Sequence, residues 1–402
     1  MNLFCELTKD TKVYLDKLNI TIDKVFPLPR RFANNLKYDV KELSDLFTSR
    51  RSEQHLSYLN KPNLLSAYLR FFLPWNVFRL CKLLPQLNIE LKDGDTLLDI
   101  GSGPLTFILA LWISRPDLRN TSLDFIVLDR TEKALDAGEK IFNALIKDNG
   151  SAAGKWNIKK THGQFHAKSF ILQKIIINNG KPFAFVSAIN IFNELYYKLS
   201  PRDKTGLEKL ALQNASLLAQ SVNNGSILAF EPGIPRSGEF ISCLRSAFLD
   251  LGFDIDAPCL HTEACPYPGG LVPGKGKAKW CHFPFNTDEA PISLKKLSMA
   301  AGIPKQRAVL SFLYVKKILN KTDINKNNKI YKNNDSEKSC RVISDVFPVE
   351  HYNACYVCSQ SDPVLLKTAS KAQDYILESG NIVNFTLDGK RDEKSGALTG
   401  II

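Results

Sequence analysis

The chain has 402 residues, 44% of them hydrophobic, which is enough to bury one sizeable core and smaller satellites. Its formal net charge of +12 favours a polyanionic partner. The apolar stretches are too short to span a bilayer, and Glu6, Asp10 and Asp16 make the first residues unlike a transit peptide. We therefore predict a cytoplasmic protein with no membrane partner. Nine cysteines in that reducing compartment favour metal binding or catalysis over a disulfide framework.

Residues 1–90 are predicted to form a helical N-terminal region. In residues 56–87 the apolar positions recur at helical spacing and are interrupted by Pro62, Pro74 and Pro85. Beyond residue 90 the pattern changes to apolar strands, predicted at 96–104, 122–130, 183–192, 226–233 and 308–319, with helices predicted at 131–147 and 204–222. Strands that alternate with helices indicate a parallel sheet, so residues 91–318 are predicted to form an α/β domain.

Three further segments are predicted from composition. Residues 257–285 are rich in Cys, Pro and Gly and are expected to form a cysteine-rich insertion within the α/β domain. Residues 319–339 are mostly Asn and Lys and are expected to form a linker. Residues 340–402 should then form a small C-terminal unit, with apolar stretches at 341–347, 354–360 and 381–387.

A glycine turn stands at the end of the first predicted strand of the α/β domain. It carries Asp99, Gly101 and Gly103, and Asp129 ends the second predicted strand. Glycines at such a turn let the backbone approach a ligand closely and direct amides at it. A carboxylate one βα unit later can accept hydrogen bonds from two ribose hydroxyls at once. This arrangement predicts a nucleotide cofactor at the turn.

The turn resembles that of the class I AdoMet-dependent methyltransferases, which implies a Rossmann-like sheet that binds S-adenosylmethionine. By this resemblance Gly101 and Gly103 would hold the amino-acid part of the cofactor, and Asp129 its ribose hydroxyls. A nicotinamide dinucleotide fold is the alternative, but it prefers G-x-G-x-x-G, and Pro104 follows Gly103 here.

Asn193 and Glu194 follow the third predicted strand and are the candidate catalytic residues. Strand ends carry the chemistry in open α/β sheets, so these side chains could contact a substrate, or they could cap the next helix. The chain has no Asn-Pro-Pro-Tyr motif and no Pro-Cys nucleophile on this strand, so no general base is assigned.

The cysteine-rich insertion is a candidate metal site, because it places Cys259, Cys265 and Cys281 among prolines and glycines. Four thiolates can close a tetrahedral zinc site or hold an iron–sulfur cluster. The fourth ligand could come from the downstream pair Cys355 and Cys358. The histidines His261 and His282 are possible substitutes, or ordinary polar loop residues.

Several motifs together resemble the methyltransferase-like family of the mitochondrial ribosomal small subunit and its bacterial relatives. They are the turn at 99–104, Glu-Pro-Gly at 231–233, Arg245, the segment 257–266 and Trp-Cys-His-Phe at 280–283. The resemblance implies a class I methyltransferase fold that associates with the small ribosomal subunit during its assembly. It also implies a [4Fe-4S] cluster, with zinc as the alternative, on ligands that by matching motifs are Cys259, Cys265, Cys281 and Cys358.

Two functions follow as expectations. The first is an AdoMet-dependent methyltransferase acting on small-subunit ribosomal RNA, and the second is a non-catalytic iron–sulfur assembly factor that keeps the fold. Residues 291–345 contain twelve Lys and Arg against four acids, a net charge of +8. We expect phosphate contacts from Lys295, Lys296, Lys305 and Arg307 in this stretch. The alternative is that its Asn/Lys part is simply a solvated linker.

Overall fold

The computed structural model describes residues 2–50, 58–147, 155–166, 170–272, 276–277, 279–317, 338–349, 352–360, 362–368 and 377–402. The chain divides into two compact units, each assembled from separate segments. The glycine-turn unit comprises 5–191 and 286–308, and the cysteine unit comprises 1–4, 192–285 and 309–402. The units therefore cut across the predicted segments, because the chain returns to the first unit after the cysteine-rich insertion. Within the described ranges, no helix has both the length and the apolarity needed to cross a membrane.

The N-terminal part of the glycine-turn unit is helical, as the apolar spacing predicts. Its helices are α1 Lys9–Val25, α2 Arg30–Ala33, α3 Leu36–Phe47, α4 Pro62–Ala67 and α5 Leu73–Leu83, with 3-10 turns at Tyr58–Asn60 and Leu84–Gln86 and a π-helical turn at Tyr68–Phe72. Pro62 begins α4, whereas Pro74 and Pro85 stand within a helical run that continues without a gap from the π-helical turn through α5 to Leu84–Gln86. Proline is tolerated at the start of α4 because the first amides of a helix have no intrahelical partner.

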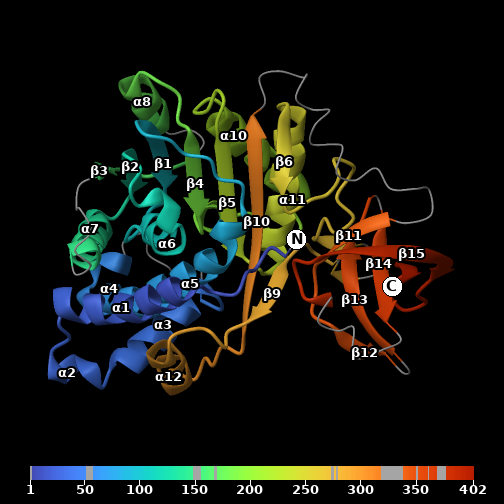
Figure 1. Ribbon diagram of the computed structural model, residues 1–402, viewed down its shortest axis with the longest axis horizontal. Coiled ribbons are helices and arrows are strands. Elements are labelled where there is room, and N and C mark those ends of the chain that lie inside the picture. The colour runs from blue at the N-terminus through green and yellow to red at the C-terminus, as the bar shows by residue number, and fades with distance from the viewer. Residues whose placement is uncertain are drawn as a thin grey trace. The chain divides into compact units, whose positions relative to one another are not determined.

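A parallel sheet follows in the same unit (Figure 1). Its strands are β1 Asp95–Ile100, β2 Leu123–Asp129, β3 Trp156–His162 and β4 Phe185–Ile189, and they pair in the order β3-β2-β1-β4. The connecting helices are α6 Thr106–Ser114, α7 Glu132–Lys147 and α8 Phe170–Asn179, with a 3-10 turn at Pro116–Leu118, and α12 Ile292–Ala300 joins the unit from later in the chain. The predicted Rossmann-like α/β class is thereby confirmed.

Strand β3 was not among the predicted strands, whereas β1, β2 and β4 were. The predicted strands are apolar almost throughout, since they are buried on both faces. Strand β3 lies outside β2 in the pairing order and alternates half-buried with exposed residues, so its hydrophobic signal is weak. Its sequence, Trp-Asn-Ile-Lys-Lys-Thr-His, therefore gives little indication of a sheet strand.

The first part of the cysteine unit contains helices and an antiparallel group of strands. The helices are α9 Phe192–Tyr196, α10 Lys204–Ala219 and α11 Pro235–Asp250. The strands are β5 Ser226–Pro232, β6 Phe253–Ala257, β9 Phe283–Asn286 and β10 Arg307–Lys317, with a short pair β7 Leu271–Val272 and β8 Gly276–Lys277. Strand β10 runs antiparallel between β5 and β6. The predicted strands at 226–233 and 308–319 are thus present.

The C-terminal part of the cysteine unit is a separate six-stranded sheet. Its strands are β11 Lys338–Val342, β12 Phe347–Val349, β13 Tyr352–Cys358, β14 Pro363–Thr368, β15 Ile382–Arg391 and β16 Leu398–Ile401. They pair in the order β11-β15-β16-β14-β13-β12, and an additional pairing of β11 with β13 closes five strands into a ring. Of the three apolar stretches predicted here, 354–360 and 381–387 overlap β13 and β15, whereas 341–347 spans the end of β11, a connection and the start of β12. Of the predicted linker 319–339, residues 319–337 lie outside the described residues.

Candidate functional site

The glycine turn has a backbone that requires its glycines. Gly101 and Gly103 adopt φ angles of +68° and +51°. A Cβ atom at Gly101 would lie 2.8 Å from Cδ1 of Ile191, whereas one at Gly103 would meet nothing within 4 Å. Gly101 is therefore fixed by packing as well as by its backbone angle, and open space faces Gly103. Leu105 also adopts a positive φ, +59°, at the position where a dinucleotide fingerprint often has glycine.

Helix α7 packs against the glycine turn. A Cβ at Gly138 would collide with the carbonyl group of Pro104 and would lie 2.7 Å from Cγ of Leu105. Only glycine at this position lets the helix pack directly on the turn. The sequence gives no separate signal for this role, since Gly138 looks like an ordinary glycine within a helical pattern.

Asp129 braces the glycine turn. Its Oδ2 accepts a hydrogen bond from the Gly103 amide at 2.8 Å, and its Oδ1 accepts one from the Thr131 amide at 2.7 Å. Burial raises the pKa of the Asp129 carboxyl, although the two amides act in the opposite direction. Each carboxylate oxygen keeps a second lone pair, so hydroxyl groups of a ligand could still donate to it.

Asp99 is a buried carboxylate at the end of β1, only 1% exposed. Ser187 in the neighbouring strand β4 donates its hydroxyl to Oδ1 of Asp99 at 2.6 Å. Among the described residues, Oδ2 of Asp99 has no hydrogen-bond partner. Burial raises the pKa of Asp99 to about 6, against the opposing effect of the Ser187 hydroxyl. A buried acceptor without a partner is costly, and a cationic ligand group would satisfy it.

Asn193 and Glu194 lie in the short helix α9 of the cysteine unit. The Asn193 side chain is buried, and Glu194 is an acid in the first helical turn, where a carboxylate interacts favourably with the helix dipole. A contact of either residue with a substrate remains a prediction.

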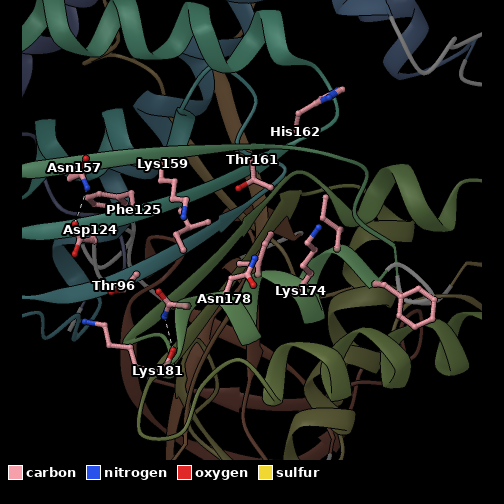
Figure 2. A pocket seen from close by; sticks show the side chains of 15 residues that line it. Thr96, Asp124, Phe125, Asn157, Lys159, Thr161, His162, Lys174, Asn178 and Lys181 are labelled. Carbon is pink, nitrogen blue, oxygen red and sulfur yellow. Dashed lines mark hydrogen bonds between the residues drawn. The ribbon is translucent and has the colours of Figure 1, made fainter.

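A cavity of about 640 Å³ lies elsewhere in the glycine-turn unit. It is lined by strands β1, β2 and β3 and by helix α8, and Figure 2 shows side chains of β3 and α8 facing each other across it. None of the candidate catalytic, cofactor or metal residues lines this cavity. The glycine turn and the cavity are therefore separate features of the unit.

The thiols of the cysteine-rich insertion lie near one another in the cysteine unit. Burial raises the pKa of Cys281 well above its ordinary value, and the neighbouring Cys265 and Cys259 thiols raise it further. The pKa of Cys358 is raised by burial and then by Cys259, Cys281 and Cys265. The structure thus brings all four predicted ligands within electrostatic range of each other. Across the described ranges, no group of three or more His, Cys, Asp or Glu side chains is arranged to hold a metal ion.

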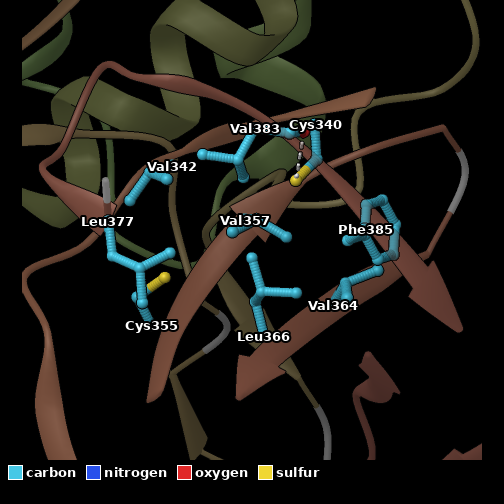
Figure 3. Close-up of a cluster of buried hydrophobic side chains, with 9 residues drawn as sticks. All are labelled: Cys340, Val342, Cys355, Val357, Val364, Leu366, Leu377, Val383 and Phe385. Atoms are coloured by element: carbon cyan, nitrogen blue, oxygen red, sulfur yellow. Dashed lines mark hydrogen bonds between the residues drawn. The ribbon is translucent and has the colours of Figure 1, made fainter. Parts of the chain in front are cut away.

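Cys355 and Cys358 face opposite sides of strand β13, because side chains alternate along a strand. Cys355 is fully buried in an apolar cluster that includes Cys340, Leu366 and Leu377 (Figure 3). Cys358 lies on the other face and interacts electrostatically with the three insertion thiols. The structure therefore separates two cysteines that the C-x-x-C motif makes equivalent, and it places Cys358 beside the insertion.

Two polar side chains, Arg245 and His261, contact sulfur atoms of the predicted metal ligands. Nε of Arg245 lies 3.2 Å from Sγ of Cys259, and its Nη2 donates to the carbonyl of His261 at 2.7 Å. Nε2 of His261 lies 3.4 Å from Sγ of Cys358. Burial lowers the pKa of His261 to about 4, and the Arg245 guanidinium lowers it further, so this ring is neutral at pH 7.

Two buried side chains form hydrogen bonds between the cysteine-rich insertion and the C-terminal sheet. Arg341 in β11 donates from Nε to the carbonyl of Pro258 and from Nη1 to that of Gly380 at 2.7 Å. The Tyr267 hydroxyl donates to the carbonyl of Val357 at 2.8 Å. Sequence patterns gave no signal for Arg341 or Tyr267, because their partners are backbone carbonyls distant in the chain.

The four side chains predicted to contact phosphate differ in their exposure and in their neighbours. Lys296 and Arg307 are exposed, whereas Lys295 is half-buried and donates to the carbonyl of Asp288 at 3.0 Å. Lys305 is half-buried, with Nζ 5.9 and 6.0 Å from the ring centroids of Phe71 and Trp75. Burial lowers the pKa of Lys305 to about 8. A role for Lys305 in packing against these rings fits its position better than a phosphate contact.

Comparison with solved structures gives only low overall likeness. A SAM-dependent methyltransferase from Thiobacillus denitrificans, in complex with S-adenosyl-L-homocysteine, has 13% identity and a TM-score of 0.31, covering 72% of this chain and 99% of that chain. A putative class I methyltransferase from Listeria monocytogenes has 11% identity and a TM-score of 0.35, covering 78% and 88%. A search of curated proteins found no match.

A family model gives the more specific result. Residues 206–378 match the model described as mitochondrial small ribosomal subunit Rsm22. The matched span contains Arg245 and all four cysteines that gather in the cysteine unit. This match confirms the resemblance inferred from the sequence motifs between residues 231 and 283, since residues 206–378 match the Rsm22 family model.

Proposed function

We propose that this protein is methyltransferase-like, binds S-adenosylmethionine and a [4Fe-4S] cluster, and acts on the small ribosomal subunit. The observation that carries this proposal is that four thiols within electrostatic range of each other lie inside the span that matches the Rsm22 family. The description of that family supports an association with the small subunit. A target in its ribosomal RNA and a cytoplasmic location are further predictions.

The glycine-turn unit would hold the cofactor. Open space faces Gly103, and Oδ2 of Asp99 is a buried acceptor that the cofactor's ammonium group would satisfy. Asp129 would accept hydrogen bonds from the ribose hydroxyls while it continues to brace the turn. When bound, S-adenosylmethionine supplies an electrophilic methyl group, and the residues of this unit bind and orient it.

The cysteine unit would hold the cluster through Cys259, Cys265, Cys281 and Cys358. Thiolate ligands suit iron–sulfur clusters and zinc alike, so the choice of iron rests on the resemblance stated above. Four thiolates concentrate negative charge in a buried place. Burial raises the pKa of Cys259, and the guanidiniums of Arg245 and Arg341 act in the opposite direction, so they would partly offset the charge of the thiolates. A metal centre here would tie the insertion to β13, so its binding would stabilise the C-terminal sheet.

Anaerobic purification followed by iron, sulfide and zinc analysis tests the cluster. We expect iron and sulfide in equal amounts and a broad absorption band in the visible blue. Zinc at one ion per chain, with colourless protein, would replace the cluster by a structural zinc site. Protein without bound metal would exclude both.

A second candidate is a non-catalytic assembly factor that retains the fold. Two observations favour it. Both oxygens of Asp129 already accept hydrogen bonds from backbone amides, and the side chain of Asn193 is buried. Mass mapping of small-subunit ribosomal RNA from cells with and without this protein separates the candidates. Loss of one modified nucleotide supports the enzyme, whereas unchanged modifications with defective small subunits support the assembly factor.

A further inference from the structure

The segment from β3 to the residue pair after α8 is the most one-sidedly charged part of the glycine-turn unit. Residues 155–181 contain six lysines and neither Asp nor Glu. This segment contributes half of the chain's net charge of +12, and it is distinct from residues 291–345. An unbroken positive charge of this kind attracts a polyanion.

Most of the residues that line the cavity of the glycine-turn unit belong to this segment, and the others come from β1 and β2. Phe125 and Ile175 provide buried apolar surface, and the exposed side chains of Lys159 and Lys174 lie at its edges. Figure 2 shows Lys159 and Thr161 extending from β3 toward Asn178 and Lys174 of α8. The cavity therefore combines an apolar floor with cations and hydrogen-bonding groups.

The lysines of the cavity are available to a ligand. Among the described residues, neither Lys159 nor Lys174 forms an ion pair, whereas Lys160 on the other side of β3 binds Asp136 and Glu139 of α7 at 2.5 and 2.7 Å. The one carboxylate in the lining, Asp124, already accepts a hydrogen bond from Asn157 at 3.1 Å. The lining carries three lysines, Lys159, Lys174 and Lys181, against the single carboxylate of Asp124, so it keeps a net positive charge.

Helix α8 adds exposed apolar side chains to this surface. Phe170, which lines the cavity, is 81% exposed, and Ile177 is 75% exposed. An exposed aromatic ring beside lysines is the arrangement that binds single-stranded nucleic acid, since bases stack on the ring while phosphates meet the cations. In double-stranded RNA the faces of the bases are covered by stacking, so no base can stack on Phe170. A small anion would gain nothing from contact with the aromatic ring.

We propose that the surface formed by β3 and α8 binds a single-stranded segment of RNA, with a base on Phe170 and phosphates at Lys159 and Lys174. This inference rests on the proposed function, because it assumes that the small-subunit partner is RNA at this surface. Asn178 and Thr161 supply hydrogen-bonding groups for the edge of a base that enters the cavity.

Fluorescence anisotropy with a labelled single-stranded RNA oligonucleotide tests the proposal on the full chain. Replacing both Lys159 and Lys174 by Gln should weaken binding and flatten its salt dependence, by about 0.7 in the logarithmic slope for each phosphate that is no longer neutralised. F170L keeps an apolar residue but removes the ring, and should weaken binding about fivefold or more, as expected for one stacked base. The duplex formed with the complementary strand should bind less tightly.

The matched control replaces Lys133 and Lys140 by Gln. Both lysines are exposed on α7, which packs on the opposite side of β3, so the change in net charge is identical. If this control weakens RNA binding and flattens its salt dependence as much as the variant of Lys159 and Lys174 does, the protein binds RNA but not at the surface formed by β3 and α8. If the wild-type protein binds neither the single-stranded oligonucleotide nor the duplex, RNA is excluded as the partner. Binding by small subunits that is insensitive to both salt and F170L would indicate a protein partner instead.

Discussion

The backbone amide of Gly103 donates to Oδ2 of Asp129 at 2.8 Å, so the residue that ends β2 holds the turn that follows β1. Asp129 therefore has a structural role besides the ribose contact that its position suggests. Its second oxygen holds the start of the next connection through Thr131. The glycine turn and Asp129 form one hydrogen-bonded arrangement.

Replacing Asp129 by Ala should lower the free energy of unfolding as well as the affinity for S-adenosylmethionine. Each loss is expected at about 1.5–3 kcal/mol, the range for hydrogen bonds to a charged group. Denaturant titration and calorimetry measure the two effects separately. Asp129→Asn keeps one acceptor oxygen and should lose less stability. A stability equal to wild type in D129A, with weakened cofactor binding, would show that the bracing contributes nothing.

Cofactor binding should weaken as the pH falls through about 6. The pKa of Asp99 is raised to about 6 by burial, and only its ionised form can accept a hydrogen bond at both oxygens while attracting a cation. The cofactor's amino group stays charged over this range, so protonation of Asp99 alone should reduce affinity about tenfold between pH 7 and pH 5. Calorimetry at a series of pH values measures this change.

Two variants check the assignment of that pH dependence. Asp99→Asn should bind weakly at every pH and show no midpoint near 6. Ser187→Ala removes the hydroxyl that lowers the pKa of Asp99, so the midpoint should move to higher pH. An unchanged midpoint in S187A would assign the titration to another group.

The two cysteines of strand β13 should respond oppositely to substitution. Cys358→Ser should lose the metal and expose residues beyond 340 to protease, because the metal would tie the insertion to this strand. Cys355→Ala should keep the metal and cost on the order of 1 kcal/mol of stability, as expected for a small deletion from an apolar core. Metal analysis with limited proteolysis compares them. Metal loss in C355A with metal retained in C358S would reverse the ligand assignment.

Arg245 should be needed for the metal centre without being a ligand. It is buried and contacts Cys259 and the His261 carbonyl, so Arg245→Gln should reduce the metal content by removing a positive charge beside the thiolates. Arg245→Lys keeps that charge but loses the planar pair of donors, and should retain more metal than Gln. Full metal content with an unshifted visible spectrum in R245Q would contradict this role.

The sequence by itself determined the parts whose signal is local. Apolar periodicity located β1, β2, β4 and β10, and Pro62 located a helix start, because backbone preferences act within a few residues. The glycine turn could also be located, since Gly101 and Gly103 must adopt a backbone that few other residues tolerate. Clustering and flanking residues likewise marked Cys259, Cys265 and Cys281.

Only the tertiary structure decided which residues meet across the chain. The motif Cys355-x-x-Cys358 is symmetric in sequence, and the alternation of β13 against one apolar cluster separates its two members. Arg341 and His261 gain their contacts from segments distant in the chain. Lys305 lies against aromatic rings, while Lys159 and Lys174 remain exposed beside a cavity. Charge composition cannot distinguish these lysines, because burial and the neighbours of each side chain are fixed only when the chain packs.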